Sequence, residues 1–390
     1  MAKAYGKLAP GRLWKLVGYG SSLVAYVIFC YYTILVGWVL FYLWESVTGG
    51  FSDLLERSAT AGDGVYKQFF NDFVKSPFKP LIFLALTMLS IFGIIVAGVK
   101  KGIERTSKFL VPALLVIMLI LAGFALFMPG AADGYRFLFD FRVDAITTDV
   151  CLAALGQCFY SFSIGMGLVT YASYFTDDTN LAKTAVSVGF LDTAVAILAG
   201  LIIFPAVFSV AGTEPGAGAS MVFVTLPAAF NSAFSSQPAL ACAVPFAFYF
   251  ILFVAALTSA MFLFEVATAF LCEAAGMKRS RSAAIIAVSS LVIAVVTSLS
   301  VGPWDFIRIM GMNLMDFLDA FTAKIVLPLT GLGAALFVGW RMGREDVMDE
   351  LSSHGRFAVI CAGPFLFTVR YLVPVLILAI MADNFISLLK

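Results

Sequence analysis

The chain has 390 residues, of which 61% are hydrophobic and 13% charged, and its formal net charge is +1. Because about a quarter of the residues in an ordinary soluble domain are charged, this composition excludes a soluble protein and places most of the surface in lipid. Lys and Arg gather in the connections between apolar runs, which indicates membrane orientation and excludes a nucleic-acid partner.

Apolar runs long enough to cross about 30 Å of hydrocarbon predict about nine transmembrane helices. They lie near residues 17–44, 80–99, 109–128, 149–174, 184–210, 241–271, 283–301, 312–340 and 358–382. Backbone groups must be paired in lipid, and no alternating pattern of short strands occurs, so these runs predict helices and not barrel strands. We expect an all-α polytopic membrane protein with a single membrane domain over residues 1–390.

The distribution of Lys and Arg predicts the orientation of the chain. With residues 1–16 in the cytoplasm, 15 of the 25 Lys and Arg fall in inner connections and eight in outer ones. The positive-inside rule therefore predicts a multi-pass protein of the plasma (inner) membrane, with the C-terminus outside. The two long outer loops, 45–79 and 211–240, would cap or gate a pathway, or serve as linkers.

Small and polar residues interrupt the predicted fourth span near its middle. Ser161, Ser163, Gly165 and Gly167 weaken a continuous helix there. Such residues are typical of helix packing in membranes. An unwound segment would instead expose carbonyl groups and helix ends that bind an ion or a zwitterion, and spacing alone leaves both interpretations open.

A carboxylate, Asp192, lies among apolar residues of the predicted fifth span. A charge at that depth is costly and usually marks an ion or proton site, although a carboxylate near a helix end could reach polar loops.

In the sixth span, the hydroxyls of Thr258 and Ser259 could bond back to their own helix. Neutral oxygens also replace the hydration shell of a monovalent cation, so these hydroxyls are a candidate sodium site.

The predicted eighth span begins with Asp316 and Asp319 and continues to Lys324. This pattern fits a local ion pair near the outer end of the helix, or a snorkelling lysine beside solvated acids.

Sequence motifs typical of enzymes are missing. The only histidine, His354, lies in a polar connection, which excludes histidine triads and multi-histidine metal sites. No phosphate-binding loop of the Walker form occurs, so an ATP-driven pump is not expected either.

Several short motifs occur in a fixed order along the chain. They are Tyr31-Tyr32 with Gly37-Trp38, residues 102–105, Pro129-Gly130, and residues 157–174, 203–205, 225–227, 257–259 and 370–374. Together they resemble the neurotransmitter:sodium symporter family, particularly its bacterial amino-acid transporters. The resemblance implies a five-plus-five inverted repeat of the leucine-transporter type. Family helices three to five would be residues 17–128, helices six to ten 129–340, and helix eleven 358–390.

The resemblance also implies a substrate site, two sodium sites and two gates. Tyr32 would bind the substrate carboxylate, and the side-chain pocket would be lined by Ile28, Tyr160, Ser161, Ser163, Met166 and Leu263. One sodium ion would use Ser161 and Asp192, and the second the carbonyl of Ala255 with the hydroxyls of Thr258 and Ser259. Asp319 would serve the outer gate, and Glu273 with Tyr174 the inner one. Met166 and Leu263 favour an apolar or aromatic amino acid.

Two departures from the family pattern carry predictions. Chloride-dependent members have a neutral amide and a serine where this chain has Asp192 and Ala196, so the carboxylate predicts chloride independence. The family's first two helices, with the motif Gly-Asn-x-Trp-Arg-Phe-Pro, have no counterpart. Both sodium sites are therefore expected to be incomplete, and the chain to be a truncated form that is inactive by itself.

The leading functional interpretation is sodium-coupled symport of an amino acid by alternating access. One rival is a transporter of the same fold group that uses protons, with Asp192 as the carrier. Another is a non-transporting membrane scaffold or fragment. Replacing sodium by choline in an uptake assay separates the first two interpretations.

Overall fold

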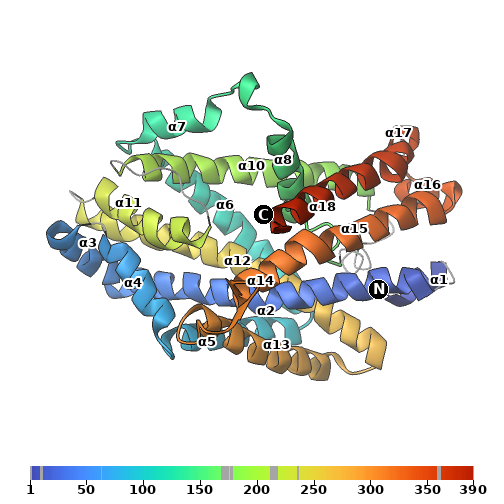
Figure 1. Cartoon of the computed structure of the whole chain (residues 1–390), viewed down its shortest axis with the longest axis horizontal. Coiled ribbons are helices and arrows are strands. Elements are labelled where there is room, and N and C mark those ends of the chain that lie inside the picture. Colours follow the sequence, from blue (N-terminus) through green and yellow to red (C-terminus); the bar gives the residue numbers. More distant parts are fainter. Residues whose placement is uncertain are drawn as a thin grey trace.

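A computed structural model gives the fold of the chain (Figure 1). It describes residues 2–8, 12–62, 64–167, 175, 179–210, 218–234, 237–357 and 362–389. Within this part, eight helices are long and apolar enough to span a membrane. They are Trp14–Thr48, Lys79–Val96, Gly102–Ala125, Leu181–Phe208, Leu240–Ala275, Arg279–Val301, Leu314–Arg341 and Gly363–Phe385. The predicted all-α membrane class is confirmed.

The elements follow one another in chain order, with π-helical turns continuing several of the helices. The first half comprises α1 (Ala2–Leu8), α2 (Arg12–Thr48), α3 (Gly50–Ala61), α4 (Gly64–Lys75), α5 (Lys79–Val96), η1 (Val99–Glu104), α6 (Arg105–Ala125), α7 (Ala131–Phe139), η2 (Val143–Ala145), α8 (Thr148–Ser161) and α10 (Leu181–Phe208). The second half comprises η3 (Met221–Thr225), α11 (Leu226–Ala233), α12 (Pro238–Ala275), α13 (Arg279–Val301), β1 (Arg308–Ile309), β2 (Met312–Asn313), α14 (Leu314–Phe321), η4 (Thr322–Val326), α15 (Leu327–Leu336), η5 (Phe337–Arg341), α16 (Arg344–Leu351), α17 (Ala362–Phe367), η6 (Thr368–Leu372) and α18 (Val373–Leu389).

Eight spans agree with the expected number of about nine, and in the predicted fourth span, 149–174, the described residues do not form one continuous helix. Helix α8 ends at Ser161, and the chain turns through residues 162–167. Ser163, Gly165 and Gly167 have φ values of 52°, 89° and 86°. This left-handed region is incompatible with a right-handed helix, and glycine adopts it most readily.

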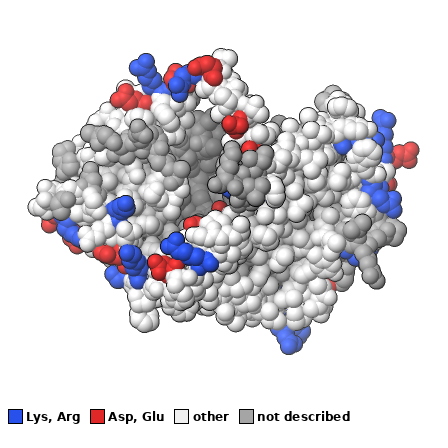
Figure 2. All heavy atoms as spheres, viewed as in Figure 1, with Lys and Arg blue, Asp and Glu red and all other residues white. Residues whose placement is uncertain are grey.

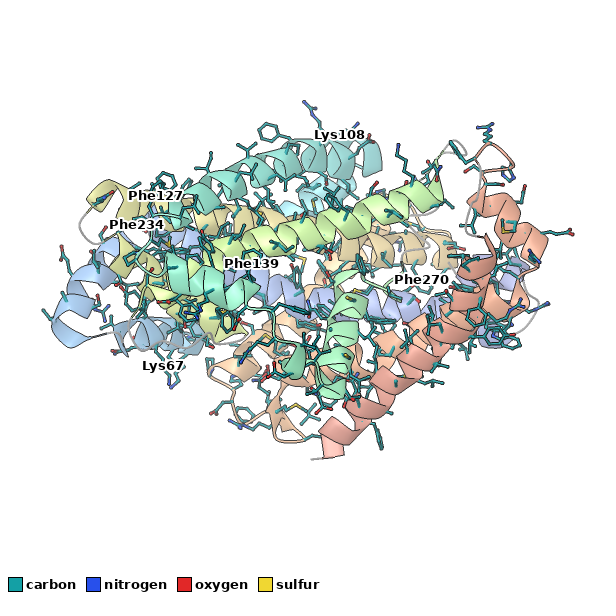
Figure 3. All side chains as sticks on the ribbon, turned by 90° about the horizontal axis from the view of Figure 1, so that it is seen from above. Lys67, Lys108, Phe127, Phe139, Phe234 and Phe270 are labelled. Atoms are coloured by element: carbon teal, nitrogen blue, oxygen red, sulfur yellow. The ribbon has the colours of Figure 1, made fainter. Side chains whose placement is uncertain are left out.

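The long helices lie along the horizontal direction of Figure 1, with α3, α4 and α11 at one end and α1, α16 and α17 at the other. Figure 2 shows charged side chains on this face gathered toward both ends, with a band carrying few of them between. In Figure 3, Lys67 and Phe127 lie toward one end and Phe270 toward the other. The elements of the two predicted outer loops, α3 and α4 in 45–79 and α11 in 211–240, thus lie at one end of the bundle.

The centre of the bundle is α2, which packs against α12, α5, α13 and α15. At the end of the bundle where α3 and α4 lie, aromatic side chains from α2, α4 and η3 pack into one core, with Phe41 stacked on Phe73 at a ring separation of 3.9 Å. The Tyr42 hydroxyl donates to the Phe223 carbonyl at 2.6 Å and anchors η3 to α2. The outer loop at 45–79 is therefore helical and packed, not a loose linker.

Candidate functional site

The turn after α8 is held in place by α15. The Thr330 hydroxyl lies within hydrogen-bond distance of two carbonyl oxygens, that of Leu327 in its own helix at 2.9 Å and that of Gly165 in the turn at 3.2 Å. A Cβ atom on Gly165 would lie only 2.6 Å from the Thr330 oxygen, so the close approach requires glycine. The interpretation of an unwound segment is therefore correct for residues 162–167.

The turn faces a cavity of about 480 Å³ inside the bundle. Four segments form its wall: α2, the end of α8 with the following turn, α10 and α12. The residues that line it are Ile28, Tyr32, Tyr160, Ser161, Phe162, Ser163, Met166, Val188, Asp192, Ser259, Phe262, Leu263 and Val266. All seven residues predicted for the substrate site are brought together here.

The wall is mostly apolar, with a small polar corner. The Ser161 hydroxyl donates to the Asp192 carboxylate, at 2.9 Å from Oδ1 and 2.8 Å from Oδ2. This bond joins α8 to α10, and both residues line the cavity. On the opposite wall the Tyr32 hydroxyl lies beside the Ser259 hydroxyl. Such a cavity suits a ligand with one charged or polar end and an apolar body.

The residues predicted for the second sodium site lie on one turn of α12. The Thr258 hydroxyl donates to the Ala255 carbonyl at 2.8 Å, and Ser259 follows on the cavity wall. The helix thus forms the back-bond that was the alternative interpretation. The Ala255 carbonyl oxygen and the Thr258 hydroxyl oxygen are close enough to bind one cation together. The hydroxyl would present a lone pair to the cation.

The predicted gate residues have different surroundings. Asp319 accepts a hydrogen bond from the Tyr31 hydroxyl at 2.9 Å, which links α14 to α2. In the part of the chain that the structure describes, neither Asp316 nor Asp319 forms an ion pair with Lys324, so the local pair suggested by the sequence does not form there. Glu273 is half-buried near the end of α12, and Tyr174 lies outside the described residues.

The most buried charge in the described part of the chain is Glu265 on α12, with none of its side chain exposed. Arg279 donates to both of its carboxylate oxygens, at 2.8 and 2.5 Å, and also to the Ile95 carbonyl at 3.1 Å. The pair joins α12, α13 and α5. The sequence contained one indication of this ion pair: a carboxylate in an apolar helix requires a cation from another part of the chain.

Four cavity residues were missed by the sequence: Phe162, Val188, Phe262 and Val266. Helical spacing could have identified three of them. Phe262 and Val266 lie three and seven residues after Ser259, and Val188 lies four before Asp192, so each shares a helix face with a predicted site residue. Phe162 lies in the turn, where helical spacing no longer applies.

Three comparisons agree on what the chain resembles. The model of the sodium:neurotransmitter symporter family matches residues 72–390. A sodium-dependent transporter of Haemophilus influenzae is 31% identical over 96% of this chain and 79% of its own length. The sodium-dependent transporter YhdH of Bacillus subtilis is 28% identical over 99% of this chain and 83% of its own length.

The fold has a counterpart among solved structures. The crystal structure of MhsT in complex with L-phenylalanine has a TM-score of 0.85 and 36% sequence identity, covering 98% of this chain and 84% of MhsT. The predicted leucine-transporter-like architecture agrees with this match. The expected truncation stays a prediction.

Proposed function

Because this chain belongs to the sodium:neurotransmitter symporter family and is a sodium-dependent transporter, we propose that it couples sodium entry to the uptake of an apolar or aromatic amino acid. The main support is the cavity, where Ser161 and Asp192 form a polar corner beside the apolar side chains of Ile28, Met166 and Leu263. MhsT, a relative of known structure, was crystallised in complex with L-phenylalanine.

Two groups of residues would each bind one sodium ion. Asp192 and Ser161 would supply a charged and a neutral oxygen to one sodium ion, and Ala255, Thr258 and Ser259 would contribute neutral oxygens to a second. Sodium is a transported co-substrate here, held while the outer side is accessible and released inside. Binding of cations beside the amino-acid site would raise the affinity for substrate on the sodium-rich side, which is the basis of coupling.

An uptake assay tests this function. The purified chain in proteoliposomes should take up labelled L-phenylalanine when sodium is outside, and not when choline replaces it. Uptake driven by a proton gradient without sodium would favour the proton-coupled rival. Absence of both binding and uptake would overturn the proposal for this chain and support the inactive form expected from the sequence.

Removal of the Tyr32 hydroxyl should weaken substrate binding. We expect Tyr32→Phe to lower the affinity for the amino acid by about 10- to 100-fold, because a hydrogen bond to a carboxylate contributes about 1.5–3 kcal/mol. Titration of labelled substrate measures this. Tyr26→Phe is the matched control, since the Tyr26 hydroxyl bonds Ser289 away from the cavity; an equal loss in both variants would contradict a direct contact.

Chloride should not be required. The fixed charge of Asp192 would balance sodium where other members bring chloride, so replacing chloride by gluconate at constant sodium should leave uptake unchanged. Uptake that disappears without chloride would refute this assignment.

The proposed orientation places the N-terminus in the cytoplasm of a bacterial-type inner membrane and the C-terminus outside. It rests on the excess of Lys and Arg in the connections at the end of the bundle where α1 and α16 lie. Labelling of single cysteines placed in α4 and α16 by an impermeant reagent on intact cells tests it. Labelling of the α16 cysteine but not the α4 cysteine would reverse the orientation.

A further inference from the structure

An arginine and a tryptophan join two membrane helices at the end of the bundle where α16 and α17 lie. Arg370 in η6 donates through Nε to the Gly339 carbonyl in η5 at 2.6 Å, and Trp340 donates through Nε1 to the Arg370 carbonyl at 3.0 Å. The guanidinium carbon lies 5.5 Å from the centre of the Trp340 ring. A Cβ atom on Gly339 would be 2.9 Å from the Arg370 Cα atom, so glycine permits this contact.

These contacts set the depth of Arg370 in the membrane. By sequence it falls inside the span Gly363–Phe385, where a charge is costly. Its direct partners Gly339 and Trp340, however, lie at the very end of the span Leu314–Arg341. Arg370 therefore lies beside the end of the span Leu314–Arg341, where we expect the headgroups to begin.

The guanidinium ends remain available for a ligand. Of the five N–H donors that arginine carries, only Nε has an oxygen acceptor among the described residues, and Arg341 is exposed with no ion pair there. Acidic side chains of α16 line a hollow with His354, and neither arginine lines it. Arg370 and Arg341 thus bring two positive charges to the η5–η6 contact, and neither charge has a carboxylate partner among the described residues.

Aromatic side chains flank the arginines on the exposed surface. Trp340 is 59% and Tyr371 46% exposed, and their rings meet edge to face at 5.5 Å. Tryptophan and tyrosine in this position are typical of the headgroup level, where their rings contact lipid and their polar atoms remain hydrated. The exposed rings beside Arg370 are therefore the kind of surface that we expect to contact lipid headgroups.

We propose that Trp340, Arg341, Arg370 and Tyr371 form a binding site for the headgroup phosphate of an anionic phospholipid. The guanidinium groups would hold the phosphate oxygens in charge-assisted hydrogen bonds, and the rings would contact the glycerol and upper acyl chain. The site is independent of sodium and of the transport cavity. It would tie η5 to η6 through a lipid as well as through the direct bonds.

Quenching of Trp340 fluorescence by brominated lipid tests the site. The chain is reconstituted in vesicles of fixed phosphatidylcholine and phosphatidylglycerol content, with bromine on either one lipid or the other, and Trp340→Phe isolates the Trp340 signal by difference. We expect phosphatidylglycerol to quench it preferentially, with about fivefold local enrichment for each arginine. Arg341→Gln and Arg370→Gln should each reduce the preference, and the double variant should abolish it.

The control is Arg308→Gln, an exposed arginine near the opposite end of the same span. It should leave the preference unchanged. Arg341 is exposed and forms no ion pair within the described residues, so Arg341→Gln should alter packing little. Equal quenching by the two brominated lipids in the parent protein, or a preference that survives in the double variant, would overturn the proposal.

Discussion

Asp192→Asn is expected to lower the apparent affinity for sodium by about 100- to 1000-fold. The substitution keeps an oxygen that can accept the Ser161 hydrogen bond, but it removes the only charge among the described residues that line the cavity. Two unit charges about 4 Å apart interact by about 4 kcal/mol in a partly solvated protein site, which corresponds to roughly a thousandfold in binding. The measurement is the sodium concentration needed for half-maximal binding of labelled amino acid.

Asp144→Asn is the matched control, because Asp144 is an exposed carboxylate in η2 outside the cavity. It should bind sodium like the parent protein. An unchanged sodium requirement in Asp192→Asn would place the cation elsewhere. If Asp192 instead carries a proton, the parent protein should respond to a proton gradient in the absence of sodium, and the variant should lose that response.

Glu265→Ala should destabilise the folded protein by about 3–5 kcal/mol. The substitution leaves the Arg279 guanidinium without the carboxylate that accepts two of its hydrogen bonds in a buried site, and an uncompensated buried charge is costly. Reversible unfolding of the purified protein in mixed micelles with increasing denaturing detergent measures the change. The loss should appear with and without sodium, since neither residue lines the cavity.

Two further variants distinguish the loss of the Glu265–Arg279 ion pair from a general loss of packing. Glu265→Leu combined with Arg279→Met removes both charges and should recover most of the stability, because an apolar pair of similar volume often replaces a buried ion pair without loss. Glu104→Ala removes an exposed carboxylate that pairs with Lys108 at 2.7 Å, and should cost less than about 0.5 kcal/mol. A large effect of Glu104→Ala together with a small one of Glu265→Ala would contradict the account.

The amino-acid sequence predicted most of the membrane spans and much of the cavity wall. Apolar run length is a local property, so eight predicted spans correspond to long helices of the described chain. The pocket residues Tyr160, Ser161 and Ser163 were implied by the resemblance to the family, and they line the cavity from the end of α8 and the following turn. Apolar wall residues such as Val266 carry no signal of their own among so many apolar side chains.

What the sequence did not predict depends on contacts between distant helices. Whether residues 162–167 pack as a helix or unwind depends on Thr330, which follows more than one hundred and sixty positions later and bonds Gly165. The bond from Tyr31 to Asp319 likewise joins α2 to α14. The contact of Arg370 with Gly339, at the end of another span, likewise does not follow from the place of Arg370 in an apolar run. Register between helices is set by tertiary packing, which composition and periodicity do not encode.

The most direct test of the central proposal is uptake of labelled L-phenylalanine by the purified chain in proteoliposomes under an inward sodium gradient. The account predicts accumulation that collapses when choline replaces sodium and that Asp192→Asn abolishes at moderate sodium concentration. Accumulation that is equal in sodium and choline, or no accumulation and no sodium-dependent binding, would contradict it.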